Sequence, residues 1–321
     1  VPAPATELQL FNNEGSTPVE VTNGFTNDTT PALSGTVSAA EAGATVSVYD
    51  NISGTPVLLG IAVVGADGSW SFTTPTLTEG DHSLYTTVTD VAGNVSQPSA
   101  SIDFNIDLTP PAAVNDATLV NGDNTEITGG FTNDTTPVLS GTAELGSVVT
   151  IRDGDTVLGS VAVDQDGGWR YPLPTLSESE HSLTTTVTDA AGNSGEASTP
   201  IVFTVDITAP EAASAVIISN DSSGEPVTIT NGITNDNTPV LSGKAEAGSF
   251  VTITDSVLGE LGTATVDNDG NWSFTVPQLE DGNYSLTTTV TDVAGNTGPV
   301  SSPVAITVLA TPPADATDLQ L

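Results

Sequence analysis

The sequence contains three similar repeats, at intervals of about a hundred residues. A string Thr-Asn-Asp-x-Thr-Pro occurs three times, and its aspartates are Asp28, Asp134 and Asp236. The tryptophans keep the same register, at Trp70, Trp169 and Trp272. Solenoid repeats run to roughly 20–50 residues, so a period this long predicts three whole domains in tandem. We expect them at residues 1–107, 108–206 and 207–309, with residues 310–321 starting a further repeat.

The expected boundaries coincide with proline-containing linkers at Asp107–Pro111 and Asp206–Pro210. Proline fixes φ and stiffens a short link, so we expect limited freedom between neighbouring domains. The tail Ala316–Leu321 echoes Ala5–Leu10, and the sequence contains no methionine. Both features lead us to expect a segment taken from a longer array.

The charge is strongly one-sided, with 40 acidic residues, three basic ones and a formal net charge of −37. Nucleic-acid and anionic-membrane partners are disfavoured, because both rely on Lys and Arg. A solvated surface is one explanation of the charge. Concentrated like charge also destabilises a compact state unless something neutralises it, and divalent cations are obvious candidates. The absence of cysteine excludes disulfides, zinc–thiolate sites and thiol catalysis. No apolar run approaches the ~20 residues that span a bilayer, and no signal peptide is visible.

Short β-branched runs separated by Asn-Gly, Asp-Gly and Pro turn signals predict an all-β fold of three tandem immunoglobulin-like β-sandwich domains. Placed end to end, these domains would form an elongated rod. In the first repeat we expect seven strands, at Glu7–Phe11, Pro31–Val37, Thr45–Asp50, Val57–Val64, Trp70–Thr74, Ser83–Thr89 and Ser101–Ile106. The stretch Asn12–Thr30 is ambiguous, and could hold a second piece of the first strand or an extra hairpin.

The motifs together resemble a known family. In order they are Asn-Asp-x-Thr-Pro-x-Leu-Ser-Gly, Ala-Glu-x-Gly, Asp-Gly-x-Trp, Thr-Asp-x-Ala-Gly-Asn and Asp-x-Thr-x-Pro. This series is similar to the bacterial Ig-like repeats of giant, type I-secreted, non-fimbrial (SiiE-like) adhesins, and it covers essentially the whole chain. The resemblance implies an extended, calcium-stiffened stalk that holds a terminal binding region away from the cell.

Strand topology places many of the recurring carboxylates at the domain junctions. With alternating strand directions, the loops after the second, fourth and sixth strands gather at the end where the chain enters the domain. We therefore expect junction calcium sites in the second and third repeats, to which the preceding linkers contribute. The candidate ligands are Asp107, Glu144, Asp164, Asp166 and Asp189, and then Asp206, Glu246, Asp267, Asp269 and Asp292. Calcium takes 6–8 oxygen ligands in flexible geometry, which suits such a set. The alternative is that these residues form ordinary β-turns, which favour Asp, Asn and Gly.

The other candidate ligands are less complete sets. Repeat 1 offers Glu41, Asp67 and Asp90, but its preceding linker aspartate lies outside the sequence. Leu309 takes the position of Asp107 and Asp206, so we expect a weaker or absent site at the outgoing junction. A second cluster around Asp28, Asp134 and Asp236 could hold metal, or could merely shape the entry to the following strand.

The aromatic residues and histidines suggest structural positions. Trp70 and Phe72 lie two apart on one strand face, as do Trp272 and Phe274. With few aromatics in the chain, that face is best explained as core, and a carbohydrate-binding platform is the alternative. Two histidines occupy matching positions, and the third repeat has Tyr284 there. This fits a turn or a half-buried strand position better than a catalytic base. No Ser/His/Asp grouping stands out, so we expect no enzyme.

The sequence therefore predicts a secreted, cell-surface stalk of a bacterial adhesin, stiffened by Ca²⁺ and contacting chiefly the neighbouring repeats of its own chain. Host glycans or proteins would be bound through other regions. The main alternative is a multivalent host glycan- or protein-binding module. An accessory region of a secreted polysaccharide-degrading enzyme is a third possibility.

Overall fold

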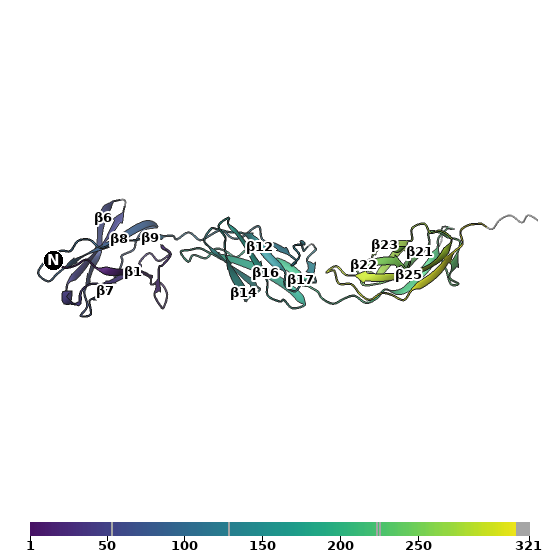
Figure 1. The fold of residues 1–321 in the computed structure, drawn as a ribbon, viewed down its shortest axis with the longest axis horizontal. Coiled ribbons are helices and arrows are strands. Elements are labelled where there is room, and N and C mark those ends of the chain that lie inside the picture. The colour runs from purple at the N-terminus through teal and green to yellow at the C-terminus, as the bar shows by residue number, and fades with distance from the viewer. Residues whose placement is uncertain (53, 128, 223, 225, 313–321) are drawn as a thin grey trace, which may run out of the picture. The chain divides into compact units, whose positions relative to one another are not determined.

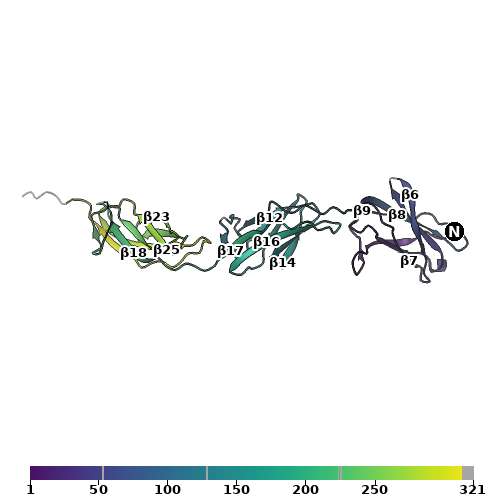
Figure 2. The same ribbon diagram turned by 180° about the vertical axis from the view of Figure 1, so that it is seen from behind.

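The computed structural model describes residues 1–312 except residues 53, 128, 223 and 225. Within this part of the chain the regular structure is β, apart from one 3-10 helix, η1, at Ala39–Glu41. Each repeat forms its own group of strands, coloured purple to blue, teal, and green to yellow in chain order (Figure 1, and from behind in Figure 2). The all-β expectation is confirmed. The echo at Ala316–Leu321 lies outside the described residues.

Repeat 1 contains two sheets, with the strand orders β2-β1-β4-β7 and β3-β9-β8-β5-β6. All seven expected strands are present, within a few residues of the expected bounds. The strands of this repeat are β1 (Thr6–Asn12), β2 (Val19–Glu20), β3 (Phe25–Thr26), β4 (Ala32–Thr36), β5 (Thr45–Ile52), β6 (Thr55–Val63), β7 (Ser69–Thr73), β8 (Gly80–Thr89) and β9 (Ile102–Ile106).

The ambiguous stretch between β1 and β4 contains both of the alternatives. β2 pairs antiparallel with β1, with Phe11 opposite Glu20, and so forms a hairpin. β3 instead pairs parallel with β9, with Phe25 opposite Asn105. The chain therefore leaves the first sheet after β2 and adds a short edge strand to the second sheet.

Repeats 2 and 3 keep this plan. Repeat 2 has the orders β10-β12-β15 and β11-β17-β16-β13-β14, and repeat 3 has β19-β18-β21-β24 and β20-β26-β25-β22-β23. The strands of repeat 2 are β10 (Thr118–Val120), β11 (Phe131–Thr132), β12 (Val138–Thr142), β13 (Val148–Asp153), β14 (Thr156–Ala162), β15 (Gly168–Pro172), β16 (Ser179–Thr188) and β17 (Ile201–Val205). Those of repeat 3 are β18 (Ser214–Asn220), β19 (Val227–Thr228), β20 (Ile233–Thr234), β21 (Val240–Lys244), β22 (Phe250–Asp255), β23 (Gly259–Thr265), β24 (Asn271–Thr275), β25 (Gly282–Thr291) and β26 (Val304–Val308).

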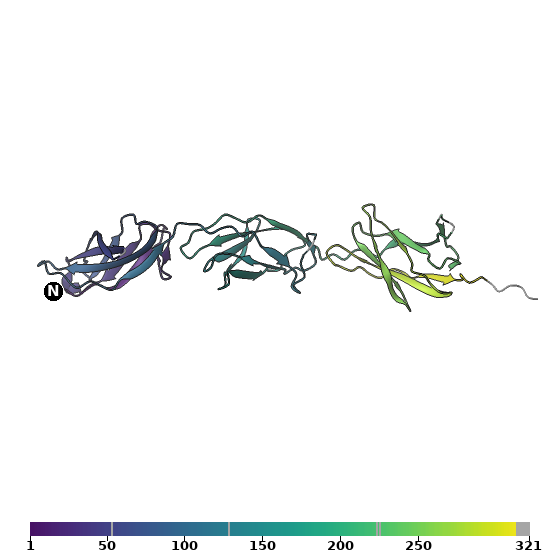
Figure 3. The ribbon, with the colours of Figure 1, turned by 90° about the horizontal axis from the view of Figure 1, so that it is seen from above.

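The core of repeat 1 is built from alternating residues of both sheets. Leu10 and Leu33 come from the first sheet, Val46 and Leu84 from the second, and each is at most 1% exposed. Burying a side chain of this size contributes roughly 1.5–3 kcal/mol. Repeat 1, coloured purple to blue, is seen from above in Figure 3. Period-2 alternation therefore defines which face of each sheet is buried and which faces solvent.

The tryptophan of each repeat is buried, and the Leu-Ser-Gly motif makes room for it. Trp70 is 4% exposed and lies opposite Gly35 in the β4–β7 pairing. A Cβ at Gly35 would lie 2.9 Å from Cζ2 of the Trp70 ring, so only glycine fits there. Gly243 and Trp272 repeat this arrangement. The expectation that the tryptophans belong to the core is confirmed.

Candidate functional site

Three loops of each repeat carry most of the candidate ligands. They are named here as BC (residues 143–147 in repeat 2), DE (163–167) and FG (189–193), with equivalents in the other repeats. The BC and DE loops are joined by backbone hydrogen bonds, from Ala143 N to Gly167 O at 2.9 Å and from Val163 N to Ser147 O at 3.0 Å. The carboxylates of these two loops are therefore anchored on adjoining backbone.

In the DE loop the first aspartate closes its own turn. Asp164 Oδ1 accepts hydrogen bonds from the backbone N–H groups of Asp166 at 2.9 Å and Gly168 at 2.8 Å. Asp267 does the same in repeat 3, where hydrogen bonds from the Asn271 backbone and side chain lower its pKa. The second aspartates, Asp166 and Asp269, are exposed.

Repeat 1 has Gly65 where repeats 2 and 3 have the first aspartate of the DE loop. Its remaining acid, Asp67, bonds to the backbone N–H and hydroxyl of Ser69, and the hydroxyl is the main cause of its lowered pKa. Asp67, Asp164 and Asp267 thus act first as turn-closing acceptors.

The BC glutamates present their backbone to the loop and their side chains to solvent. Glu144 O accepts hydrogen bonds from Ser147 N and Oγ, and Glu246 O is bonded in the same way by Ser249. Glu41 instead ends helix η1, which Ser38 caps. The side chains of Glu144 and Glu246 are exposed.

At the first junction, one side-chain amide links the linker to the FG loop. Asn193 Nδ2 donates to the backbone carbonyl of Asp107 and to Oδ2 of Asp189, both at 2.8 Å. Asp189 Oδ1 accepts the backbone N–H groups of Ala191, Gly192 and Asn193. The turn therefore brings the linker backbone beside the FG carboxylate.

The second junction repeats this bridge. Asn296 Nδ2 donates to the carbonyl of Asp206 and to Oδ2 of Asp292, again at 2.8 Å. Desolvation of the carboxyl group by the surrounding loops, followed by the charges of Asp292 and Asp206, raises the pKa of Glu246. The BC, FG and linker carboxylates of this junction therefore lie close enough to repel one another.

The FG loop of repeat 1 and the exit of repeat 3 each show only part of the junction arrangement. Asn94 in repeat 1 donates to Oδ2 of Asp90 at 2.8 Å, the intrarepeat half of the bridge. Leu309 N donates to Thr234 O, as Asp206 N does to Thr132 O, so Leu309 occupies the equivalent backbone position but carries no carboxylate. Across the described residues, no three Asp, Glu or His side chains stand close enough together to hold a metal ion as they are placed.

The Asn-Asp-x-Thr-Pro aspartates lie in a different place and have a structural role. Asp28 is 0% exposed, and its Oδ1 accepts from Thr30 N at 2.7 Å while Oδ2 accepts from Asn13 N at 2.8 Å. The motif thereby ties the turn after β1 to the start of β4. The equivalents in repeats 2 and 3 make the same two kinds of bond, from Asp134 and from Asp236.

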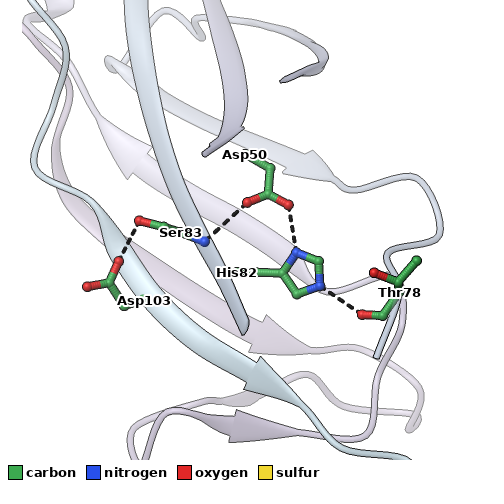
Figure 4. A network of polar contacts seen from close by, with 5 residues as sticks. All are labelled: Asp50, Thr78, His82, Ser83 and Asp103. Atoms are coloured by element: carbon green, nitrogen blue, oxygen red, sulfur yellow. Dashed lines mark hydrogen bonds and ion pairs between the residues drawn. The ribbon is translucent and has the colours of Figure 1, made fainter. Parts of the chain in front are cut away.

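Sequence reasoning missed a buried polar network at the end of β5. Asp50 Oδ2 lies 2.6 Å from His82 Nδ1, and Asp50 Oδ1 accepts the backbone N–H of Ser83 at 3.1 Å (Figure 4). His82 Nε2 in turn bonds the Thr78 carbonyl at 2.7 Å, which requires a proton on that nitrogen. His82 is 4% exposed, more deeply buried than the half-buried position expected. The recurrence of Asp50, Asp153 and Asp255 was the available signal.

These features define a tandem array of immunoglobulin-like β-domains. The chain belongs to the bacterial Ig-like domain family, which matches residues 3–108, 111–207 and 210–308. The family resemblance drawn from the motifs is thereby confirmed. No helix among the described residues is long and apolar enough to cross a membrane.

Several solved structures are similar to the chain. One is a tetra-tandem repeat in the extending region of a large adhesion protein, at 26% identity over 88% of this chain and 71% of that chain, with a TM-score of 0.27. A Ca²⁺-stabilized adhesin with which an Antarctic bacterium binds ice shares 22% identity over 95% and 74%, with a TM-score of 0.33. The FN1–FN3 domains of chicken CNTN1 share 14% over 96% and 99%, with a TM-score of 0.37. No curated protein matches the chain.

Proposed function

We propose that this chain is a stalk segment of a large bacterial surface adhesin, in which Ca²⁺ at the two complete junctions stiffens the tandem repeats. The segment would lie outside the cell as a spacer without catalytic activity. Host molecules would be recognised chiefly through other regions of the parent protein. Family membership over nearly the whole chain and the adhesin-like motif series support this role.

The observation that carries the calcium proposal is the asparagine bridge at each complete junction. Asn193 and Asn296 each hold a linker carbonyl and an FG carboxylate on one amide group. The aspartate that supplies the carbonyl also carries a carboxylate of its own. The same amide group thus holds the linker backbone beside several oxygen donors.

The available donors suit calcium better than a transition metal. They are carboxylate and carbonyl oxygens, whereas the chain has no cysteine and neither histidine lies in a junction loop. Calcium is a hard cation that accepts such oxygens in irregular geometry. At the second junction, Asp206, Glu246 and Asp292 would supply negative charge, and Asp107, Glu144 and Asp189 would do so at the first.

Completing the site requires side-chain movement, chiefly of the exposed glutamates. Ordering a Glu side chain costs up to about 1.5–2 kcal/mol, which binding of a divalent ion would offset. The repulsion that raises the pKa of Glu246 would be relieved at the same time. Without the ion, this repulsion would act to loosen the linker while leaving the sandwiches folded.

Isothermal calorimetry of Ca²⁺ binding to the intact chain tests the proposal, in parallel with Asp107→Ala plus Asp206→Ala. The matched control is Glu260→Ala plus Glu280→Ala, which removes the same charge from exposed positions on β23 and in the loop before β25, away from the BC, DE and FG loops. We expect saturable binding that the junction variant weakens at least about tenfold, or ~1.4 kcal/mol per site. The control should bind like the parent chain.

Two results would contradict the calcium proposal. One is the absence of saturable binding at millimolar Ca²⁺. The other is equal weakening in the junction and control variants, which would indicate that only the total charge attracts the ion. Either result would leave the junction carboxylates as turn-forming residues.

A further inference from the structure

The outward face of the five-stranded sheet differs between the three repeats, although the strands beneath it are the same. In repeat 1 this face carries Tyr49 on β5 and Tyr85 on β8, directly opposite each other in the strand register. Their rings stack, with centroids 5.2 Å apart and planes 12° apart. The positions equivalent to Tyr49 and Tyr85 are Arg152 and Thr184 in repeat 2, and Thr254 and Thr287 in repeat 3.

Apolar side chains extend the tyrosine pair along the edge strand. Leu58 on β6 lies opposite Tyr49, and Ile61 lies opposite Ser47 one row further along. Leu58 is 55% exposed and Ile61 is 59% exposed. Their equivalents are Val157 and Ser160 in repeat 2, and Glu260 and Thr263 in repeat 3. Repeat 1 alone combines stacked aromatic rings with this exposed apolar row.

The stack is not needed to hold the sheet together. Cross-strand aromatic pairs stabilise a sheet, which is the simplest reason for two tyrosines to face each other. Yet β22 and β25 form the same pairing with Thr254 opposite Thr287. A solvent-facing aromatic pair that the other repeats do without is more readily explained by binding.

A polar hollow adjoins the tyrosines on the same sheet. Ser83 lies two residues from Tyr85 on β8 and opposite Asp103 on β9, and its hydroxyl donates to Asp103 Oδ1 at 2.6 Å (Figure 4). One row further, Asn105 Nδ2 donates to Asp81 Oδ1 at 2.8 Å. Each carboxylate has a second oxygen for another donor. The hollow is lined by Phe25, Asn51, Asp81, Ser83, Asp103 and Asn105.

We propose that this face of repeat 1 binds a neutral oligosaccharide, with Tyr49 and Tyr85 as its stacking surface and the hollow as its hydrogen-bonding part. The C–H face of a sugar ring is apolar and would cover the tyrosine rings. Sugar hydroxyls donate and accept, so they match the carboxylate and amide groups beside the rings. A few placed polar groups next to an apolar surface are what orient a small ligand.

Charge selects the neutral class of ligand. The three basic residues are Arg152, Arg170 and Lys244, so repeat 1 has no cation to pair with an acidic sugar or a phosphate. Asp81 and Asp103 would repel such groups. A second copy of this chain is also disfavoured as the occupant, because each copy has a net charge of −37. This binding function is independent of the proposed calcium sites.

Saturation-transfer NMR with the intact chain provides the test, using the neutral hexasaccharides of glucose (β-1,4 and α-1,4), mannose and N-acetylglucosamine as probes. Hexagalacturonate serves as the anionic comparison. The test variant is Tyr49→Thr plus Tyr85→Thr, which copies the pair found in repeat 3. The control is Thr254→Ala plus Thr287→Ala on the corresponding face of repeat 3. Melting curves of both variants verify that they fold.

We expect saturable binding of at least one neutral probe, weakened at least about tenfold by the tyrosine variant and unchanged by the control. Asp103→Asn should weaken it without altering the fold. The proposal is overturned if no neutral probe binds, if hexagalacturonate binds better, or if the tyrosine variant binds as well as the parent. Self-association lost in the tyrosine variant, without sugar binding, would assign the face to a second copy instead.

Discussion

An aspartate lies at or near the end of β5, β13 and β22, and its partners differ between repeats 1 and 3. Asp50 is bonded to His82 in repeat 1. Asp255, 2% exposed in repeat 3, accepts instead the backbone N–H groups of Val257, Leu258 and Ser285. Tyr284 replaces the histidine there and bonds the Glu280 carbonyl. Different hydrogen-bond donors can thus compensate for burying the same carboxylate, provided that its oxygens accept hydrogen bonds.

These bonds give repeat 3 a defined pH dependence. Burial acts to raise the pKa of Asp255, but the backbone N–H bonds outweigh it and lower the pKa below its ordinary value of 3.8. A lowered folded-state pKa means that Asp255 stabilises repeat 3 fully above about pH 4, and that this contribution is lost as the pH falls through the folded-state pKa. Asp255→Asn should therefore cost about 1–3 kcal/mol at pH 7 and much less near pH 2.

Hydrogen exchange of repeat 3 peptides, measured in the intact chain at both pH values in increasing urea, checks this. Glu260→Gln, an exposed substitution on the neighbouring strand β23, is the control and should change stability by less than about 0.5 kcal/mol. An Asp255→Asn effect of equal size at both pH values would refute the electrostatic account. The loss would then reflect packing alone.

The individual aspartates show where sequence reasoning ends. Their recurrence predicts that they matter, and turn chemistry predicts that they lie in loops. Neither the recurrence nor the turn chemistry determines which N–H or O–H groups donate hydrogen bonds to these carboxylates. Asp28 bonds Asn13, whose position depends on the hairpin between β1 and β2. Such partners arise from tertiary placement, so they cannot be read from local sequence.

At the scale of elements, each linker packs against a glycine that follows the FG loop. A Cβ at Gly298 would collide with the Pro210 carbonyl, and one at Gly195 with the Pro111 carbonyl. Repeat 1 has Ser96 at this position, with the same backbone bond, to Val88 O. Both glycines therefore lie where the structure places linker backbone in close approach.

Gly298→Ser should dislodge the second linker and break the Asn296–Asp206 bond, because the added side chain occupies the space of the linker backbone. Since serine is accepted at Ser96, the fold of repeat 3 should survive. We expect exchange of the Asn296 side-chain amide protons, followed by NMR, to quicken by on the order of tenfold, about 1.4 kcal/mol of local stability. Thr297→Ser, beside it and exposed, should leave the exchange unchanged. Unchanged exchange in Gly298→Ser would show that the linker is not held by this contact.

The strands themselves were largely predictable from the sequence. Alternating β-branched residues and turn signals located all seven expected strands of repeat 1. The stretch between β1 and β4 was not resolved, because β2 and β3 are two residues each and join different sheets. Segments this short carry too little periodicity, and their pairing depends on neighbours far along the chain. Likewise, the need for glycine in the Leu-Ser-Gly motif is explained only by the tryptophan ring that packs against it.

For the whole molecule, the net charge of −37 means that the ionic environment should govern how the repeats behave together. Small-angle scattering should give a larger maximum dimension and a narrower distribution of shapes in Ca²⁺ than in EDTA, because the proposed junction ions would hold each linker in one conformation. The melting temperatures of the sandwiches should change little between Ca²⁺ and EDTA.

Sodium chloride separates a bound ion from general screening. Raising the ionic strength from about 0.15 to 1 M shortens the screening length from about 8 to 3 Å, and so weakens repulsion between exposed carboxylates without occupying a site. If specific junction sites are responsible, salt in EDTA will not reproduce the calcium effect, and Asp107→Ala plus Asp206→Ala will abolish it. If salt alone extends and orders the chain as calcium does, charge screening suffices, and the junction carboxylates need bind no ion.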